Sequence, residues 1–124
     1  MNKKVMIVDD DPSIRETVKI VLGAGGYSIC AVESGMECLD KLRNGFRGLI
    51  LMDIMMPEMD GWDTIAAIED EGLHGGNVIC MLTAVNAPGP KMEKLTECVI
   101  DYVRKPFTSE ELLETVAEYI GYVQ

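Results

Sequence analysis

Basic residues and histidine are scarce in this 124-residue chain. Lysine and arginine number 11 against 21 aspartates and glutamates, which gives a formal charge of −10. Such a surface repels nucleic-acid phosphates and anionic lipid headgroups, so we expect no direct binding to nucleic acid or to a membrane. Because His74 is the only histidine and stands in a glycine-rich turn, histidine-based catalysis is disfavoured.

Long apolar runs and paired cysteines are missing as well. The apolar run that follows Lys4 is short and ends at three aspartates, which fits neither a signal peptide nor a membrane span. We therefore expect a cytoplasmic protein. The four cysteines show no C-x-x-C or Cys/His metal spacing, and we interpret them as reduced packing residues. They are Cys30, Cys38, Cys80 and Cys98.

What the chain does contain is typical of a single globular domain. Its hydrophobic fraction is 48% and its charged fraction 26%, values that a disordered or fibrous chain does not have. The length falls in the usual range of roughly 100–200 residues for one domain. The sequence also has no linker or low-complexity stretch, so residues 1–124 are predicted to form one domain.

Short apolar runs with little alternation predict strands that are buried on both faces of a sheet. They cover Val5–Val8, Tyr27–Val32, Leu49–Met52, Val78–Leu82 and Val99–Val103. Segments with helical spacing follow each run, and capping boxes are predicted at Ser34 with Glu37 and at Thr108 with Glu111. Alternation of this kind predicts an α/β domain with a parallel sheet and right-handed crossovers.

The fourth helical segment is the weakest of the five. Only Met92 and Leu95 mark its apolar face, and the stretch Ala87-Pro88-Gly89-Pro90 stands where the helix should begin. Proline is tolerated only in the first turn of a helix. We therefore expect this helix to be short or displaced.

Polar residues that follow the predicted strands form the candidate site, because ligands of such sheets bind beyond the carboxyl ends of the strands. Asp9, Asp10 and Asp53 would lie close together, and their mutual repulsion demands a compensating cation. Mg²⁺, or Mn²⁺ in its place, suits these oxygen ligands. Lys105 supplies a fixed positive charge and Thr83 a hydroxyl, so the group is suited to phosphoryl transfer with Asp53 as candidate nucleophile.

These residues occur in motifs that resemble the receiver domain of two-component response regulators. The resemblance runs from about Lys4 to Tyr122 and implies a doubly wound (βα)5 flavodoxin-like sandwich with a parallel sheet in the order 2-1-3-4-5. Its motifs are Val8-Asp9-Asp10, Leu51-Met52-Asp53-Ile54-Met55-Met56-Pro57 with Gly61, Leu82-Thr83-Ala84, and Asp101-Tyr102-Val103-Arg104-Lys105-Pro106-Phe107.

The resemblance implies a role for each acidic residue. Asp53 matches the residue that accepts a phosphoryl group from a phosphohistidine on a sensor histidine kinase or a phosphotransfer protein. Asp10, Asp53 and the backbone carbonyl of Met55 match the Mg²⁺ ligands. Asp9 matches the second acidic residue, which often acts through metal-bound water. Such a domain is not a general enzyme, because it catalyses only its own phosphorylation and dephosphorylation.

The resemblance also implies how a signal would leave the site. Lys105 matches the lysine that pairs with the phosphoryl group, and its peptide bond to Pro106 is cis in the family. Thr83 matches the hydroxyl that moves to the phosphate, and Tyr102 the aromatic ring that turns inward with it. The surface of the fourth helix, fifth strand and fifth helix would then contact an unidentified downstream protein, with the chain a monomer or a weak dimer.

Met55 and Val85 stand two residues after Asp53 and Thr83, at positions where family members that differ in phosphoryl lifetime vary. Neither side chain can orient a water molecule by hydrogen bonding. We therefore expect a comparatively long-lived phosphoryl group. Asp11, which precedes Pro12, is interpreted as a helix N-cap rather than a metal ligand.

Other functions fit the sequence less well. A haloacid-dehalogenase-like phosphohydrolase would use Asp9 as its nucleophile, but Thr83-Ala84-Val85-Asn86 stands where that class needs a later acidic motif. A flavodoxin-like cofactor domain needs a phosphate loop where three aspartates stand. A degenerate receiver that only mediates protein contacts would not need the full set of site residues found here.

Overall fold

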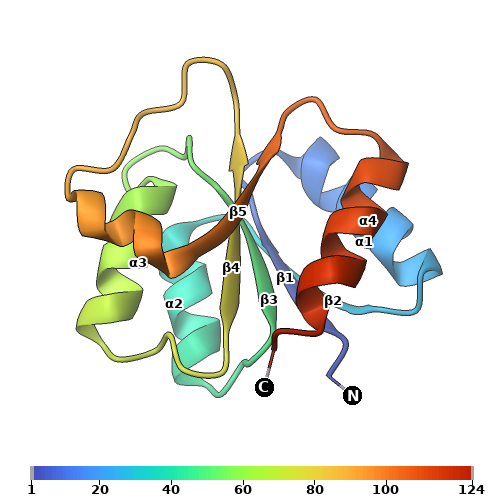
Figure 1. Cartoon of the computed structure of the whole chain (residues 1–124), viewed down its shortest axis with the longest axis horizontal. Helices are drawn as coiled ribbons and strands as arrows, with labels where there is room; N and C mark the ends of the chain where they lie inside the picture. Colours follow the sequence, from blue (N-terminus) through green and yellow to red (C-terminus); the bar gives the residue numbers. More distant parts are fainter. Residues whose placement is uncertain (1, 124) are drawn as a thin grey trace.

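A parallel sheet lies between two layers of helices in the computed structural model, which describes residues 2–123 (Figure 1). The strands are β1 (Lys4–Val8), β2 (Ser28–Val32), β3 (Leu49–Asp53), β4 (Val78–Thr83) and β5 (Val99–Arg104). The helices are α1 (Pro12–Ala24), α2 (Gly35–Arg43), α3 (Gly61–Asp70), α4 (Ser109–Ile120) and the 3-10 helix η1 (Glu93–Cys98). Among residues 2–123, no helix combines the length and the apolar character needed to cross a membrane.

The strand order is β2-β1-β3-β4-β5 and every pairing is parallel, which confirms the predicted fold. All carboxyl ends of the strands therefore meet at one edge of the sheet, at the top of Figure 1. The register pairs Val8 with Met52, so that the chain leaves β1 beside the end of β3. Asp53 in turn pairs with Leu82 on β4.

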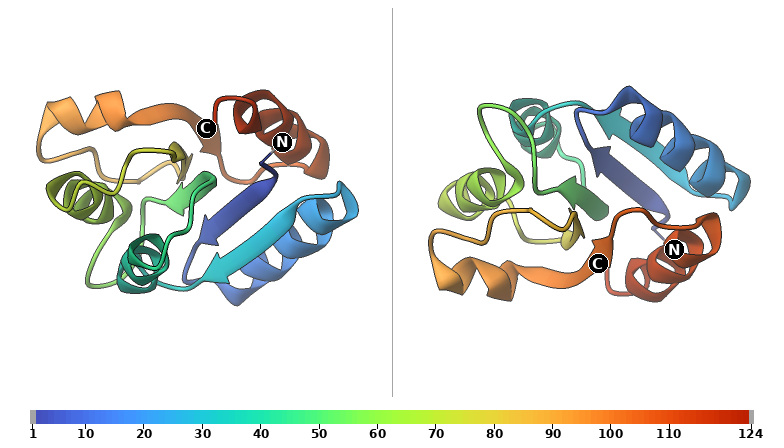
Figure 2. Two further views of the ribbon diagram at one scale, coloured as in Figure 1. Left: turned by 90° about the horizontal axis from the view of Figure 1, so that it is seen from below. Right: turned by 90° about the horizontal axis from the view of Figure 1, so that it is seen from above.

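The core has two halves because successive side chains of a strand point to opposite faces of the sheet. Met6 and Val8 pack on the face covered by α2, α3 and η1, whereas Val5 and Ile7 pack on the face covered by α1 and α4. Figure 2 shows the helices on both sides of the sheet. With both faces covered, the strands need apolar residues at every position, which explains why the apolar runs did not alternate.

Side chains cap the helices largely as predicted. Asp11 accepts a hydrogen bond from the Ser13 backbone N–H at 2.8 Å and is therefore the N-cap of α1. Thr108 and Glu111 form the predicted capping box of α4. The prediction for α2 was only half right: Ser34 accepts from the Glu37 N–H, but the Glu37 carboxylate accepts from the N–H of Glu33.

The segment between β4 and β5 departs most from a regular alternation of strand and helix. Residues 84–92 contain no helix, and only the short η1 precedes β5. The Trp62 indole Nε1 donates a hydrogen bond to the Pro88 carbonyl at 2.9 Å and ties this loop to α3. The expectation of a short or displaced fourth helix is thus confirmed, and α4 is the fifth helical segment of the sequence prediction.

Candidate functional site

Three carboxylates meet at the carboxyl edge of the sheet. Asp9, Asp10 and Asp53 each offer an oxygen atom, and these atoms all lie within 4.8 Å of one another. Asp53 is the last residue of β3, whereas the sequence predicted that the strand ends at Met52 and that Asp53 follows it. Asp9 is fully buried, Asp53 is 5% exposed and Asp10 is exposed. Two of the three charges are therefore shielded from water.

Lys105 lies across the site from β1 and β3. Its ammonium Nζ is 2.8 Å from Asp9 Oδ2 and 3.3 Å from Asp53 Oδ1. Its backbone N–H donates to the Thr83 carbonyl at 2.7 Å, and its peptide bond to Pro106 is cis, as the resemblance implied. The backbone of β4 and β5 thus directs the ammonium toward both carboxylates.

The electrostatic balance of the site favours added positive charge. Burial, and next the negative charge of Asp9, raise the pKa of Asp53 to about 6, although Lys105 opposes the shift. Burial acts to lower the pKa of Lys105, but the hydrogen bond and the charge of Asp9, with Asp53, outweigh it and raise that pKa. One lysine thus does not fully compensate the carboxylates.

The donor set fits a hard divalent cation such as Mg²⁺. All the side-chain donors are carboxylate oxygens, which are the ligands that Mg²⁺ prefers. Both oxygens of Asp9 already accept hydrogen bonds, from the Asp11 N–H and from Lys105, whereas Asp10 is exposed. Asp10 and Asp53 are therefore the better placed for direct ligation. The Met55 N–H donates to Asp53 Oδ1 at 3.2 Å, which places the Met55 peptide beside the cluster.

Gly61 fixes the loop that follows Asp53. Its N–H donates to the Ile54 carbonyl at 2.8 Å. A Cβ atom at this position would lie 2.6 Å from the Asp53 carbonyl oxygen and 2.9 Å from the Ile54 Cα, closer than side chains tolerate. Only glycine lets the start of α3 pack this closely on the end of β3.

Thr83 and Tyr102, the expected switch residues, lie on β4 and β5, and of the two Thr83 is joined to the site through its carbonyl, which accepts from the Lys105 N–H. The half-buried Thr83 is the last residue of β4, and its hydroxyl donates to the Ala84 carbonyl at 3.3 Å. The Tyr102 side chain is 43% exposed, and its ring centroid is 6.3 Å from that of Trp62. Met55 and Val85, two residues after Asp53 and Thr83, are 48% and 78% exposed, so solvent reaches both.

Sequence reasoning missed Arg15. Its Nη1 donates to the Asp9 backbone carbonyl at 2.8 Å, and its Nη2 is 3.8 Å from the Glu33 carboxylate. The guanidinium therefore holds the chain where it leaves β1. The spacing of the apolar residues in α1 identifies Arg15 only as a residue on the polar face of the helix, so nothing in the sequence indicated this role.

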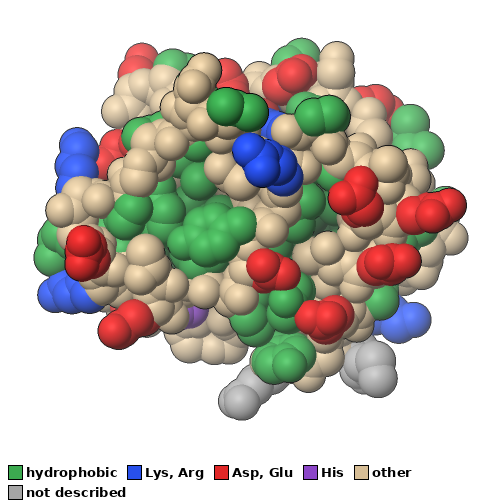
Figure 3. Space-filling view, turned by 45° about the horizontal axis from the view of Figure 1, so that its top comes forward, with side chains coloured by type: hydrophobic (Ala, Val, Ile, Leu, Met, Phe, Trp, Pro, Cys, Tyr) green, Lys and Arg blue, Asp and Glu red, His purple; other side chains and the backbone are tan. Residues whose placement is uncertain are grey.

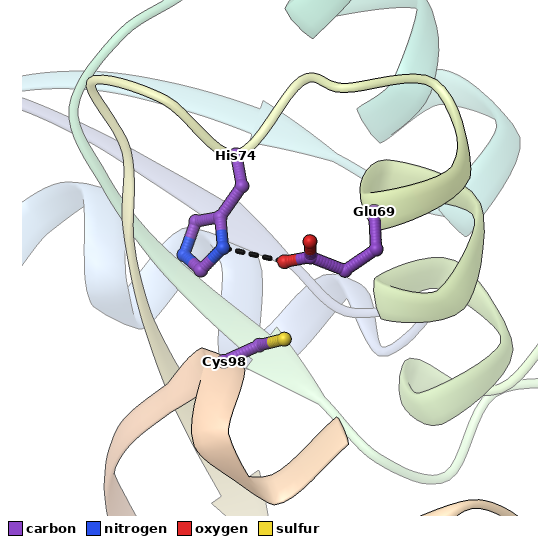
Figure 4. A group of neighbouring side chains, drawn as sticks. All are labelled: Glu69, His74 and Cys98. Atoms are coloured by element: carbon purple, nitrogen blue, oxygen red, sulfur yellow. Dashed lines mark hydrogen bonds and ion pairs between the residues drawn. The ribbon is translucent and has the colours of Figure 1, made fainter. Parts of the chain in front are cut away.

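A second cluster was also missed, at the opposite end of the sheet. Glu69 at the end of α3, His74 in the turn before β4 and Cys98 at the end of η1 come together there (Figure 4). All four cysteines are free, and Cys38 and Cys80 are buried in the core as predicted. Cys98 does more than pack, because its sulfur lies within 4.8 Å of the Glu69 and His74 ligand atoms. The one available signal was that His74 and Cys98 precede neighbouring strands.

Comparison with solved structures shows the same fold. A crystal structure of a response regulator receiver domain protein (CheY-like) from Methanospirillum hungatei JF-1 has a TM-score of 0.94 and 51% sequence identity, covering 96% of this chain and 94% of that one. The Vibrio cholerae chemotaxis protein CheY4 has a TM-score of 0.80 and 28% identity, covering 95% and 98%.

Sequence comparison leads to the same family. The response regulator MprA of Mycobacterium sp. (strain KMS) is 33% identical over 113 residues, which cover 91% of this chain and 48% of that protein. The chain therefore spans about half the length of the curated relatives it matches. The family model described as response regulator receiver domain matches residues 5–117. The chain belongs to the response regulator receiver domain family of two-component systems.

Proposed function

We propose that this chain is a phospho-accepting switch in which Asp53 takes a phosphoryl group from a phosphohistidine of a sensor histidine kinase or a phosphotransfer protein. The observation that carries the proposal is the position of Asp53, whose Oδ1 lies 3.3 Å from the Lys105 ammonium beside the buried Asp9. The family match leaves the haloacid-dehalogenase-like alternative, with Asp9 as nucleophile, without support.

The transfer needs an ionised Asp53 held in one orientation. With a pKa of about 6, the carboxylate is mostly ionised at neutral pH. Lys105 and the Met55 N–H both contact Oδ1, which leaves Oδ2 as the oxygen that attacks phosphorus. The new P–O bond forms an acyl phosphate, the P–N bond of the donor breaks, and its electron pair stays on the imidazole, which takes up a proton. Lys105 balances charge on the phosphoryl oxygens.

Asp10, Asp53 and the Met55 carbonyl would hold the divalent cation directly, with Asp9 acting through water. When bound, Mg²⁺ or Mn²⁺ would supply the positive charge that neutralises the carboxylates and the phosphoryl oxygens. The pKa of Asp53 reflects the need for this charge, because burial and Asp9 both disfavour its ionised form.

Phosphorylation adds about −1.5 to −2 charge and three acceptor oxygens at this edge of the sheet. The Thr83 hydroxyl would turn from the Ala84 carbonyl to the phosphoryl group, and the exposed Tyr102 ring would move inward. The output surface would then be η1, β5 and α4. Figure 3 shows hydrophobic side chains gathered on the η1–β5 side of this surface and acidic side chains over α4.

Other properties remain predictions from the sequence. They are a single receiver domain over residues 1–124, a chain that acts chemically only on its own aspartyl phosphate, a cytoplasmic location, and a monomeric or weakly dimeric state that contacts a downstream protein.

Labelling with a small phosphodonor tests the proposal. The chain is incubated with acetyl phosphate and Mg²⁺. Uptake is measured with a radiolabelled phosphoryl group, and in a parallel sample the modified residue is mapped with tritiated borohydride, which reduces the acyl phosphate to an alcohol and releases the phosphate. We expect the modified residue to be Asp53 and Asp53→Asn to take up no label, whereas Asp40→Asn, an exposed change on α2, labels normally. Label on Asp9 would instead support the phosphohydrolase.

A further inference from the structure

Three side chains of types that commonly bind metal ions converge where β4 and β5 begin, at the amino-terminal edge of the sheet. Glu69, His74 and Cys98 each offer one ligand atom, and these atoms all lie within 4.8 Å of one another. His74 Nδ1 is 2.5 Å from Glu69 Oε1, and Figure 4 shows the Cys98 side chain extending toward the same point. A carboxylate, an imidazole and a thiol thus face one position.

The backbone around these residues is fixed, so the convergence does not depend on a free loop. The His74 carbonyl accepts from the Asn77 N–H at 2.9 Å, and the buried Asn77 side chain in turn bonds to Leu73 and Gly48. Glu69 lies on the last turn of α3. The third residue, Cys98, ends η1 immediately before β5.

The geometry points to a divalent transition-metal ion of the Zn²⁺ type held by Glu69, His74 and Cys98, and we propose this site as a metal clamp between α3 and η1. Imidazole and thiolate select ions such as Zn²⁺ over Mg²⁺, which the carboxylates at the other edge suit. A tetrahedral Zn²⁺ site places ligand atoms about 3.3–3.6 Å apart, given metal–ligand distances of about 2.0–2.3 Å. The His74 and Glu69 ligand atoms would move apart from 2.5 Å to reach that geometry, and Cys98 already lies within 4.8 Å of both.

The surroundings leave room for a fourth ligand. A hollow of about 580 Å³ is lined by all three residues and also by Asp70, Glu97 and Lys94. Its acidic side chains outnumber its one lysine, and the chain as a whole carries a charge of −10, so a cation is attracted. Water from this hollow completes the coordination. Binding displaces the thiol proton of Cys98, which passes to solvent. It also displaces the proton shared between His74 Nδ1 and Glu69 Oε1, which passes to solvent or to His74 Nε2.

Such an ion would stabilise the segment between β4 and β5, which is the least regular part of the fold. The short η1 stands where a longer fourth helix was expected, and it precedes β5 directly. Ligation by Cys98 would fix the end of η1 to the end of α3. The clamp is at the opposite edge of the sheet from Asp53, so its success or failure is independent of the proposed phosphorylation.

Cobalt substitution tests the site. Co²⁺ is titrated into the reduced, metal-free chain with saturating Mg²⁺ to fill the acidic site, and the thiolate-to-cobalt charge-transfer absorption is recorded, followed by competition with Zn²⁺. We expect one equivalent of Co²⁺ to bind with this absorption. Cys98→Ser abolishes the absorption, and His74→Gln keeps it but weakens binding at least about tenfold.

Cys30→Ser is the matched control, because Cys30 is a half-buried free cysteine outside the cluster. It leaves both the absorption and the affinity unchanged. The proposal is overturned if no charge-transfer absorption develops, if the absorption persists in Cys98→Ser, or if it is lost in Cys30→Ser. Because His74→Gln retains every cysteine, an unchanged affinity in that variant would also overturn it.

Discussion

Trp62 on α3 and Tyr102 on β5 form an aromatic pair, with ring centroids 6.3 Å apart and ring planes inclined by 49°. Trp62 is 4% exposed, whereas Tyr102 is 43% exposed, so only the tyrosine ring can move without disturbing the core. The pair links the core of the α3 face to the expected output surface. Because Trp62 is the one tryptophan of the chain, the protein's tryptophan fluorescence reports on the surroundings of this side chain, which include the Tyr102 ring and the Pro88 carbonyl.

We predict that an acyl-phosphate mimic alters Trp62 fluorescence. Beryllium fluoride with Mg²⁺ should change the emission of the wild type as Tyr102 turns inward. Thr83→Ala removes the hydroxyl expected to move toward the phosphoryl group and should abolish most of the change. Thr96→Ala, which removes an exposed hydroxyl on η1, serves as the control and should respond as the wild type does. A full response in Thr83→Ala would contradict the coupling of the two residues.

Lys105 is predicted to stabilise the fold through the buried Asp9. Lys105→Met leaves a fully buried carboxylate next to Asp53 without its cation, and we expect unfolding free energy to fall by about 2–4 kcal/mol in the absence of divalent ions. Mg²⁺ should restore part of the loss by supplying positive charge. Urea unfolding with and without Mg²⁺ measures both effects.

The matched control for this substitution is Lys19→Met. Lys19 pairs with Glu16 at 3.9 Å, but both side chains are more than half exposed, so the change should cost less than about 1 kcal/mol. A double-mutant cycle of Lys105→Met with Asp9→Asn should give a coupling energy of about 1–3 kcal/mol. Coupling near zero would show that the 2.8 Å contact does not stabilise the fold.

Asp53 is predicted to oppose folding at neutral pH. The folded state raises its pKa from 3.8 to about 6, so the folded state binds this proton more tightly than the unfolded state. The contribution of Asp53 to stability therefore falls as the pH rises from about 4 to about 6 and then stays constant. Asp53→Asn should add about 3 kcal/mol at pH 7.5 without Mg²⁺ and less than about 1 kcal/mol at pH 4.

Urea unfolding of both proteins at several pH values checks this pH dependence. Glu114→Gln, a change of an exposed carboxylate on α4, should leave the stability nearly unchanged throughout. If the stability difference between Asp53→Asn and the wild type were constant from pH 4 to pH 7.5, the raised pKa would not be the cause.

The acidic site could be predicted from the sequence because the positions of its side chains follow from the order of the strands and from where each strand ends. Apolar runs mark the strands, and a doubly wound order places the end of β1 beside the end of β3, so Asp9 and Asp53 had to meet. An error of one residue in the strand bounds, as at Asp53, does not change which side chains converge.

Contacts between loops and helix ends could not be predicted in the same way. The hydrogen bond from Trp62 to Pro88 depends on the course of residues 84–92, which have no periodic pattern. The approach of His74 to Cys98 depends on where a turn and a 3-10 helix end. Hydrophobic periodicity predicts which face of an element is buried but not the path of the chain between elements.

Met55 is predicted to prolong the phosphoryl lifetime. Its side chain is 48% exposed two residues after Asp53, where an attacking water would pass, but a thioether cannot orient that water. Met55→Asn supplies an amide that can, and we expect it to speed the loss of phosphoryl label, with Mg²⁺ present, by roughly tenfold. Met36→Asn makes the same change at a 61% exposed methionine on α2 and should leave the rate unchanged. Faster loss in the wild type than in Met55→Asn would refute the expectation, since an apolar residue here should slow hydrolysis by leaving the water unpositioned.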